Sequence, residues 1–250
     1  MQDLLNVEGK IACVTGASSG LGREAALLLA RRGARVVGVA RRQDQLDSLC
    51  AEAEGDLASV RADLADRAAI AGIVGEVSSH FGAPDILINA AGINTRAPAD
   101  DADVAQWDLT LNVNLAAPFF LAQAMVPAMA AKGWGRIVNF ASLQSRRAFA
   151  NGILYGASKG GVEQLTRAMA EAWSDRGITT NAIAPGFFPT ELTQPVFNDA
   201  ALAQKNASQT CIGRNGTPQD LHGPLLFFCS EASAYVTGHL LFVDGGFTAK

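Results

Sequence analysis

A tyrosine and a lysine four residues apart are the side chains of this chain best suited to proton transfer. Tyr155 and Lys159 open a helical pattern that runs to about Arg176, and this spacing places both on one helix face. A free phenol has a pKa of about 10, so chemistry near neutrality needs roughly 4 kcal/mol of preferential stabilisation of the phenolate. Ser142 follows a strand-like segment and could hydrogen-bond the same oxygen. The set indicates acid–base chemistry at an oxygen atom, although a tyrosine and a lysine at this spacing also occur by chance in many helices.

A glycine-rich turn stands between a predicted buried strand at 10–14 and a predicted helix that begins near 23. Such a turn lets the backbone approach a pyrophosphate and directs the positive end of the helix at its charge. The glycine spacing differs from the common G-x-G-x-x-G fingerprint, and an ordinary glycine turn is the alternative. The strand before and the helix after favour a nucleotide site. Its candidate cofactor-binding residues are Gly16, Ser18, Ser19, Gly20, Leu21 and Gly22.

The end of the second predicted strand, 34–40, bears on the choice of cofactor. A site for NAD usually carries an acidic residue here for the ribose 2′-hydroxyl, whereas this chain has Ala40 followed by Arg41 and Arg42. Two guanidinium groups without a carboxylate favour a 2′-phosphate, so we expect NADP(H) to be preferred and NAD(H) to remain possible. Two solvated surface arginines are the alternative interpretation.

Two further strand ends supply candidate cofactor contacts. The third strand, 58–63, ends in an aspartate that would hydrogen-bond the adenine or else cap the helix that starts near Asp66. The fourth strand, 85–89, is followed by small residues that would let a cofactor cross the sheet edge, or that simply form a turn. The candidate contacts are Asp63, Leu64, Asn89, Ala90 and Gly92.

Strands and helices alternate along the whole chain. The remaining strands are expected at 136–140, 178–184 and 240–244. This order predicts an α/β protein with a single-domain Rossmann-type fold, in which a doubly wound parallel seven-stranded sheet is flanked by helices. Ligands of such sheets bind beyond the carboxyl ends of the strands, where Thr15, Asn89, Ser142 and Pro185 all fall. That convergence favours an enzyme.

Length and charge restrict the classes of partner. The 250 residues suit one domain covering 1–250, and the net charge of −4 with scattered Lys and Arg gives no footprint for nucleic acid or an anionic membrane. We therefore expect a small-molecule substrate. The start of the chain lacks a basic region followed by an apolar run, and no stretch of about 18 apolar residues is evident, which indicates a cytoplasmic protein. The four cysteines and three histidines are widely spaced, so free thiols are expected and no metal site.

A long, unusually apolar helical pattern covers 103–131. Asn112 and Asn114 lie inside it, which either marks a local kink that frees a carbonyl for water or reflects surface exposure. Pro118 and Pro127 fall in the same stretch, so we expect the helix to be bent or broken.

Two regions near the proposed reacting centre bear on the substrate. Arg146 and Arg147 follow Ser142 closely and favour a polar or anionic substrate, unless they merely face solvent. The region 187–217 mixes aromatic and polar residues with weak periodicity, and a substrate lid is one interpretation of it.

Over essentially its whole length the chain resembles the short-chain dehydrogenase/reductase family. The family's glycine motif corresponds to 15–22 and its Asn-Ala-Gly element to 89–92, where alanine replaces the commoner second asparagine. Its catalytic tetrad corresponds to Asn114, Ser142, Tyr155 and Lys159. The segment that contacts the nicotinamide amide corresponds to Pro185, Gly186 and Thr190.

The resemblance implies a role for each member of this tetrad. Tyr155 is the general acid in ketone reduction and the base in alcohol oxidation, and Ser142 polarises the substrate oxygen. Lys159 binds the nicotinamide ribose and lowers the pKa of the phenol. Asn114 holds a water that connects Lys159 to solvent, which gives the mid-helix asparagine a purpose. Hydride passes between the nicotinamide and the carbonyl carbon.

Within the family, the residues around 92–98, 141–145 and 155–161 look most like those of gluconate 5-dehydrogenases and related sugar-acid enzymes. By that resemblance Arg96 meets the substrate carboxylate, a bidentate task that suits a guanidinium, and Gln144 lies beside the substrate with Ser142 and Tyr155. A surface position for Arg96 is the alternative. Members of the family usually form homotetramers through their two long helices.

Three functions follow from these residues. The first is an NAD(P)(H)-dependent oxidoreductase that interconverts a secondary alcohol and a ketone on a sugar acid or polyol. The second is a 3-oxoacyl-acyl-carrier-protein reductase, which would tolerate loss of Arg96. The third is a cofactor-binding sensor without turnover, which would have no need of the phenol of Tyr155.

Overall fold

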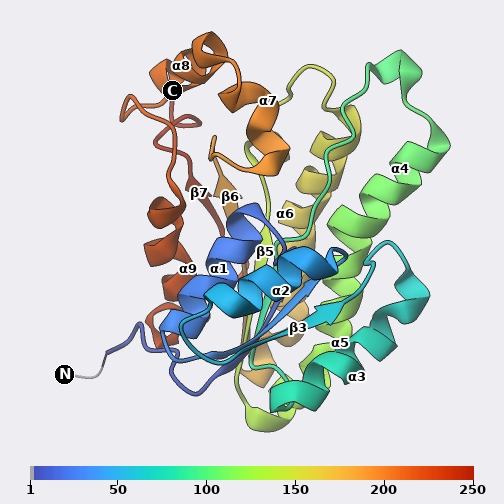
Figure 1. The fold of residues 1–250 in the computed structure, drawn as a ribbon, viewed down its shortest axis with the longest axis vertical. Helices are drawn as coiled ribbons and strands as arrows, with labels where there is room; N and C mark the ends of the chain where they lie inside the picture. The colour runs from blue at the N-terminus through green and yellow to red at the C-terminus, as the bar shows by residue number, and fades with distance from the viewer. Residues whose placement is uncertain (1–2) are drawn as a thin grey trace.

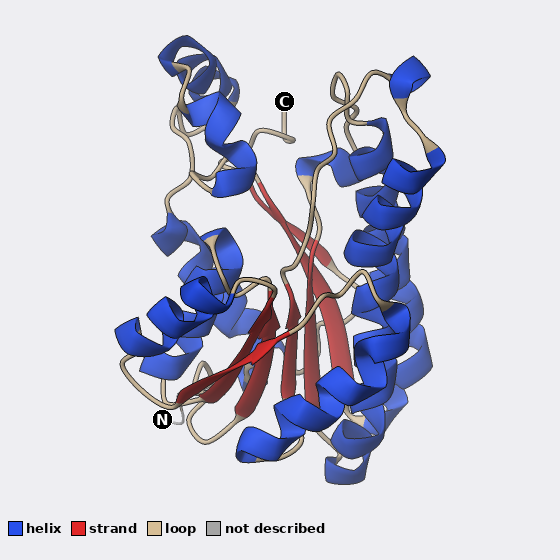
Figure 2. Cartoon of the chain, turned by 45° about the vertical axis from the view of Figure 1, so that its right-hand side comes forward, coloured by secondary structure: helices blue, strands red, loops and turns tan. Residues whose placement is uncertain are grey.

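Seven parallel strands form one twisted sheet (Figure 2). The computed structural model describes residues 3–250. The strands are β1 (Ile11–Thr15), β2 (Arg35–Ala40), β3 (Leu57–Arg61), β4 (Ile86–Asn89), β5 (Gly135–Phe140), β6 (Ile178–Pro185) and β7 (Leu240–Val243). Their order in the sheet is β3-β2-β1-β4-β5-β6-β7, and every neighbouring pair is parallel. The predicted seven-stranded parallel α/β fold is confirmed.

The central strands are buried because helices cover both faces of the sheet. All residues of β1, β4 and β5 are buried, as expected of apolar runs in a parallel sheet. The strand order reverses between β1 and β4, whose carboxyl ends lie side by side. In open sheets of this kind, the crevice beyond such a reversal is where ligands bind.

The helices form two layers (Figure 1). One layer consists of α1 (Gly20–Arg31), α2 (Gln43–Glu52) and α9 (His222–Cys229). The opposite layer consists of α3 (Ile70–Phe81), α5 (Ala117–Lys132) and α6 (Ile153–Trp173), with α4 (Val104–Leu111) packed on α6. Each layer encloses its own apolar core against one face of the sheet.

The predicted long helix is continuous and contains a wide turn. A π-helical turn, Asn112–Ala116, joins α4 to α5, so the helical path runs from Val104 to Lys132. Such turns leave the regular hydrogen-bond ladder and often occur at functional sites, which agrees with the kink predicted around Asn114. The helix was expected to be bent or broken, and it is not broken at the prolines, because Pro118 occupies the first turn of α5 and the helix continues through Pro127.

This helix also corrects one expectation from composition. Its 18-residue window has a mean hydropathy of 1.4, so by length and composition alone Val104–Lys132 could cross a membrane. The statement that no such apolar stretch exists was therefore wrong. Half of that window is buried inside the molecule, and a core helix passes the same test. The helix packs against α3 and α6.

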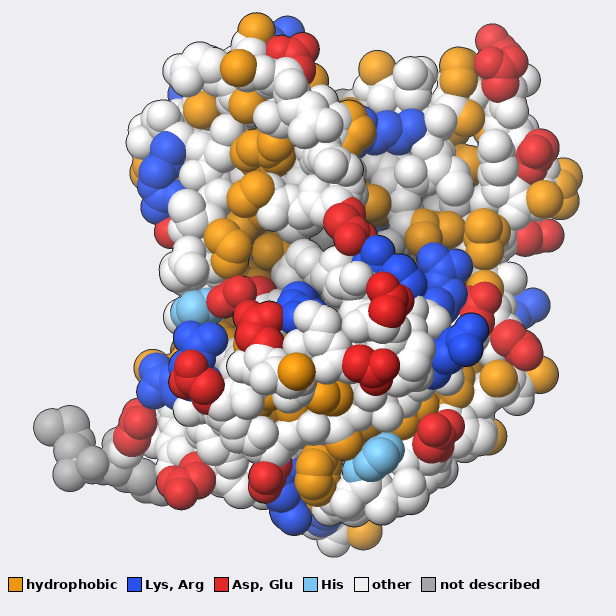
Figure 3. All heavy atoms as spheres, viewed as in Figure 1, with side chains coloured by type: hydrophobic (Ala, Val, Ile, Leu, Met, Phe, Trp, Pro, Cys, Tyr) orange, Lys and Arg blue, Asp and Glu red, His pale blue; other side chains and the backbone are white. Residues whose placement is uncertain are grey.

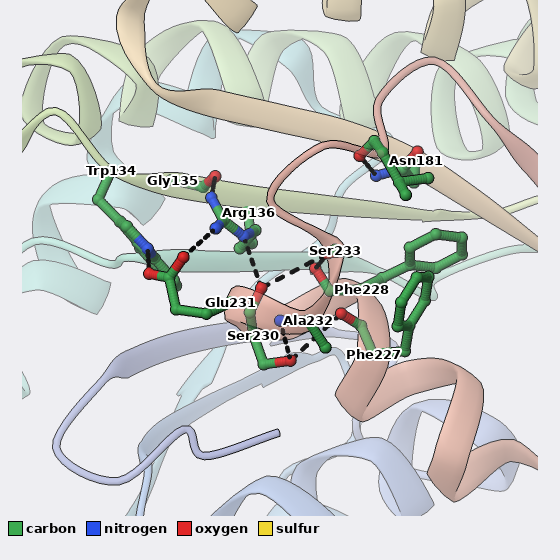
Figure 4. Close-up of polar contacts among 11 residues, drawn as sticks. Trp134, Gly135, Arg136, Asn181, Phe227, Phe228, Ser230, Glu231, Ala232 and Ser233 are labelled. Atoms are coloured by element: carbon green, nitrogen blue, oxygen red, sulfur yellow. Dashed lines mark hydrogen bonds and ion pairs between the residues drawn. The ribbon is translucent and has the colours of Figure 1, made fainter. Parts of the chain in front are cut away.

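A buried guanidinium makes several hydrogen bonds at the amino end of β5 (Figure 4). Arg136 is only 3% exposed, and it donates to the carbonyl oxygens of Ser230 at 3.1 Å and Gly135 at 3.0 Å. Its third contact is Glu231 at 3.3 Å, whose carboxylate also accepts from the indole of Trp134. Burial lowers the pKa of Arg136, and the charge of Glu231 opposes that shift. The contacts attach the turn after α9 to β5.

The region 187–217 contains more regular structure than its weak periodicity predicts. A 3-10 turn, η6 (Glu191–Thr193), leads into α7 (Gln194–Phe197) and α8 (Ala200–Gln209). Figure 1 shows α7 and α8 beyond the carboxyl ends of β6 and β7, at the same end of the molecule as the start of α4. This position covers the edge of the sheet where the predicted site residues lie.

Candidate functional site

A cavity of about 910 Å³ lies at the carboxyl edge of the sheet, between the glycine turn, the start of α6 and the 187–217 region. Figure 3 shows the surface hollowed below α7, with Lys and Arg side chains gathered beside the hollow. Nearly all of the predicted site residues line the cavity. They are Gly16, Ser18, Ser19, Gly20, Leu21, Gly22, Arg41, Arg42, Asp63, Leu64, Ala90, Gly92, Arg96, Ser142, Gln144, Tyr155, Lys159, Pro185, Gly186 and Thr190.

The proposed proton-transfer residues meet at one end of this cavity. Tyr155 and Lys159 are both buried on the first turns of α6, and the Nζ atom of Lys159 lies 5.7 Å from the centre of the tyrosine ring. Ser142 lies two residues beyond the end of β5 and caps a short 3-10 turn, where its hydroxyl accepts the backbone N–H of Gln144 at 3.1 Å. The strand end and the helix start therefore place a hydroxyl, a phenol and an ammonium in one cavity.

The electrostatics of the pair differ from the expectation that Lys159 lowers the pKa of the phenol. Burial raises the pKa of Tyr155, while interaction with the Ser142 hydroxyl and the charge of Arg96 oppose this shift. Burial lowers the pKa of Lys159 to about 8, and its ammonium donates to the carbonyl oxygen of Phe140 at 2.6 Å. In this structure the phenol is a weaker acid than a free tyrosine. Chemistry near neutral pH therefore requires further positive charge beside it.

Asn114 lies behind the cavity and does not line it. Its side-chain oxygen accepts the N–H of Ile93 at 2.9 Å, and its amide donates to the Ile93 carbonyl at 2.9 Å and to Ser158 at 3.0 Å. A Cβ atom built on Gly92 would lie 3.4 Å from the Asn114 oxygen and 3.6 Å from Nζ of Lys159. Asn114 and Lys159 thus face one small space that the glycine leaves open.

Asn89 also lies outside the cavity lining, and its assignment as a cofactor contact stays a prediction. Its amide donates to Asn139 on the neighbouring strand at 2.9 Å, within the buried sheet. The link to the next turn is made instead by Thr15, whose hydroxyl accepts the N–H groups of Ala90 and Ala91, each at 3.1 Å. Thr15 therefore holds the ends of β1 and β4 together, and Asn89 holds the end of β4 to β5.

The glycine turn has the shape and the open donors that a diphosphate needs. Gly16 and Gly20 adopt φ angles of +69° and +56°, which disfavour other residues. A Cβ atom on Gly22 would lie 2.4 Å from the carbonyl oxygen of Gly16, so only glycine allows this contact. Ser19, the N-cap of α1, makes no side-chain hydrogen bond to the helix, and the first N–H groups of α1 remain available to an anion.

One of the two arginines after β2, Arg42, has a carboxylate partner that the local sequence does not reveal. Glu191, in η6, binds Arg42 through two hydrogen bonds of 3.0 and 2.9 Å. Arg41 lines the cavity, and its carbonyl accepts from Arg61 at 3.2 Å. Glu191 is the functional candidate that sequence reasoning missed. Its position directly after Thr190, in the segment assigned to the nicotinamide, is the signal that could have found it.

Asp63 lies two residues beyond the end of β3, and its carboxylate accepts the N–H of Ala65 at 3.0 Å. Asp66 instead caps the following 3-10 turn. Asp63 lines the cavity, where its carboxylate can contact a bound ligand. Among the described residues, the side-chain oxygens of Gln144 and Asn94 are buried without a hydrogen-bond partner. Both residues line the same cavity.

Neither Arg146 nor Arg147 lines the cavity, so these two arginines are not evidence for a polar or anionic substrate. Arg146 pairs with the buried carboxylate of Glu163 on α6 at 2.7 Å. Arg147 donates to the carbonyl oxygen of Phe247 at 3.3 Å and lies over its ring. Both arginines anchor the turn after β5.

Comparison with known proteins identifies the family. A family model described as enoyl-(acyl carrier protein) reductase matches residues 16–248. Gluconate 5-dehydrogenase of Gluconobacter oxydans (strain 621H) is 41% identical over 251 residues, which cover 99% of this chain and 98% of the relative. The crystal structure of a gluconate 5-dehydrogenase from Burkholderia cenocepacia J2315, in complex with NADP and tartrate, matches with a TM-score of 0.93 and 36% identity, covering 99% of this chain and 98% of the other. The chain belongs to the short-chain dehydrogenase/reductase family.

Family membership confirms the enzyme class predicted from the residues. The chain is an NAD(P)-dependent oxidoreductase that interconverts a secondary alcohol and a ketone. A second activity is found among similar members of the family, since the 3-oxoacyl-acyl-carrier-protein reductase of Thermotoga maritima is 36% identical over 245 residues. These cover 97% of this chain and 99% of the relative.

The four cysteines of this dehydrogenase are free. Cys13 and Cys229 are buried, and burial raises the pKa of each thiol to about 12. Cys50 is half-buried and Cys211 is exposed. Residues 3–250 contain no group of three or more His, Cys, Asp or Glu residues that could hold a metal ion.

Proposed function

We propose that this enzyme is an NADP-preferring dehydrogenase that interconverts a hydroxyl and a ketone on a sugar acid, as a gluconate 5-dehydrogenase does. The observation that carries the proposal is the charge of Arg96. Arg96 lines the same cavity as Tyr155 and acts electrostatically on its phenol. A carboxylate bound by the guanidinium of Arg96 would therefore place the neighbouring carbons of a short polyol chain within reach of the phenol.

The cofactor assignments rest on the shape and charge of the cavity. The N–H groups at the start of α1 would hold the diphosphate, and Arg41 and Arg42 would hold a 2′-phosphate. Asp63 and Leu64, with Ala90 and Gly92, would lie along the adenosine half and the sheet edge. The nicotinamide amide would meet Pro185, Gly186 and Thr190. When bound, the cofactor supplies or accepts the hydride.

The side chains of the cavity would carry out the proton transfer and position the substrate. Tyr155 gives its phenolic proton to the substrate oxygen during reduction and takes it back during oxidation. Ser142 hydrogen-bonds the same oxygen, and Gln144 lies beside it in the cavity. Lys159 holds the ribose and, through the space beside Gly92, exchanges protons with a water bound by Asn114. The short path suits a proton relay.

The relatives favour a sugar acid over a carrier-bound thioester. The relative from Gluconobacter acts on gluconate by its name, and the structure from Burkholderia contains tartrate, a small hydroxy acid, beside NADP. A dehydrogenase that accepts polyols, the D-threitol dehydrogenase of Mycolicibacterium smegmatis, is 35% identical over 247 residues. These names support a polyhydroxylated substrate class.

The decisive test measures the oxidation of NADPH with 5-keto-D-gluconate, beside NADH and beside an acetoacetyl thioester. We expect fast NADPH-dependent turnover of the keto acid, loss of that turnover by orders of magnitude in Tyr155→Phe, and a raised KM in Arg96→Ala. Turnover of the thioester alone, unaffected by Arg96→Ala, would refute the sugar-acid assignment. Binding of NADPH without any turnover would instead support a sensor.

We also propose a cytoplasmic homotetramer assembled through the long helices. Val104, Trp107 and Leu109 are exposed on α4, and a groove of about 650 Å³ between this helical path and α6 is lined mainly by apolar residues. Light scattering of the purified protein tests the assembly, and a monomer would refute it.

We infer further that 1–250 acts as one domain with 187–217 as its lid, since Phe188 of that region lines the cavity.

A further inference from the structure

One ion pair joins the proposed lid to the proposed cofactor site. Glu191 in η6 and Arg42 after β2 are 149 positions apart in the sequence, yet two parallel hydrogen bonds connect them. The same carboxylate accepts the hydroxyl of Ser19 at 3.0 Å, and the same guanidinium donates to the hydroxyl of Ser18 at 3.2 Å. Figure 3 shows basic and acidic side chains side by side at the rim of the hollow above α2.

The backbone of the glycine turn also lies close to the residue that precedes Glu191. A Cβ atom on Gly20 would lie 3.2 Å from the side chain of Thr190, so the lid touches the glycine turn at the start of α1. Glu191 therefore lies over the positive end of α1 as well as against Arg42. The hydrogen bond with Arg42 lowers the pKa of Glu191, and the hydrogen bond with Glu191 raises the pKa of Arg42, so both groups are charged at neutral pH.

The pair is placed where it can exchange partners. The side chains of Arg42 and Glu191 are 44% and 59% exposed, so water and ions reach both. An exposed pair of this kind is worth at most about 1 kcal/mol, which a phosphate dianion can replace by binding the same planar guanidinium in the same bidentate way. If Glu191 stayed in place, its charge would repel that dianion.

We propose that Glu191 is a specificity-determining residue that competes with the 2′-phosphate of NADP(H) for Arg42 and thereby reduces the enzyme's preference for NADP(H) over NAD(H). This inference rests on the proposed assignment of Arg42 to the 2′-phosphate. NAD(H) carries no 2′-phosphate, so it leaves the ion pair intact, and its binding free energy includes no cost for displacing Glu191. NADP(H) must first displace Glu191. Arg41 has no acidic partner within residues 3–250, and it still attracts the phosphate.

The test compares the Kd values of NADPH and NADH by fluorescence titration of the intact protein. In Glu191→Gln the amide keeps the size of the carboxylate and removes its charge. We expect the Kd of NADPH to fall about fivefold, the equivalent of about 1 kcal/mol, while the Kd of NADH changes by less than about twofold. The matched control is Glu76→Gln on α3, which makes the same change of net charge at an exposed position outside the cavity and should alter neither Kd.

Two further variants separate this inference from the proposed function. Arg42→Gln should weaken NADPH and leave NADH unchanged, and in that background Glu191→Gln should no longer tighten NADPH. If Arg42→Gln weakens NADPH but Glu191→Gln does not tighten it, the competition is refuted and the cofactor assignment stands. Equal tightening of both cofactors also refutes it, because Glu191 would then act on lid closure alone. If Arg42→Gln leaves NADPH unchanged, the assignment of Arg42 to the 2′-phosphate fails, and the competition fails with it.

Discussion

Replacing Lys159 by methionine should stabilise the cofactor-free protein while removing its activity. Lys159 is 4% exposed, and burial lowers the pKa of its ammonium from 10.5 to about 8. The folded protein therefore binds this proton more weakly than the unfolded chain does. At pH 7 the shift corresponds to a cost of about 3 kcal/mol in the free energy of unfolding. Methionine has a similar size and carries no charge, so the variant avoids this cost.

The net gain is smaller because the ammonium also donates to the Phe140 carbonyl at 2.6 Å. The variant leaves that buried carbonyl without this donor, which costs about 1–2 kcal/mol. We expect the variant to be about 1 kcal/mol more stable at pH 7. The wild-type cost is fully present below pH 8 and disappears as the pH rises to 10.5, where the unfolded chain also loses the proton. Raising the pH from 7 to 9 should therefore remove about 1 kcal/mol of the difference.

Urea unfolding at pH 7 and pH 9, at one fixed protein concentration, measures both effects. Lys132→Met is the matched control. It removes a half-exposed ammonium that pairs with the largely buried carboxylate of Asp85 at 2.6 Å, so it should destabilise the protein. The reasoning is refuted if Lys159→Met is less stable than the wild type at pH 7, or if their difference is the same at both pH values.

Three other substitutions test separate parts of the structure. Gly22→Ala should weaken NADPH binding about tenfold or more, because its methyl group would meet the Gly16 carbonyl oxygen at 2.4 Å. Gly72→Ala, with nothing within 4 Å, should bind normally in the same fluorescence titration. Asn114→Ala should lower kcat about 100-fold with the Kd of NADPH little changed, and an unchanged kcat in steady-state assays would remove it from the proton path. Arg136→Met should lower the free energy of unfolding in urea by about 2 kcal/mol, because buried carbonyls lose their donor, while kcat/KM at low temperature stays at the wild-type value.

The elements of this fold were predictable because their signals are local. An apolar run such as that of β1 identifies a strand wherever the rest of the chain lies, and the turn at Gly16 identifies itself by the strand before it and the helix after it. The spacing of Tyr155 and Lys159 on one helix is local too. These features account for the family, the sheet and most of the cavity lining.

Other misjudged features depend on contacts between segments that are distant in the sequence. The pairing of Arg42 with Glu191 depends on how the lid folds back over the glycine turn, and no local pattern reports that. Arg146 has the charge expected of a substrate ligand, but its guanidinium forms an ion pair with the carboxylate of Glu163 on α6. The direction of the Tyr155 pKa likewise depends on burial that only the packed structure determines.

The guanidinium of Arg136 has a consequence for how this enzyme can change. It attaches β5 to the turn after α9 at the amino end of the strands, and Ser142 follows the carboxyl end of the same strand. Stability and catalysis thus depend on opposite ends of one rigid element. Loops at the carboxyl edge can acquire new side chains, and with them new substrates, without disturbing the contacts that hold the sheet and its helices together. This separation makes the scaffold evolvable.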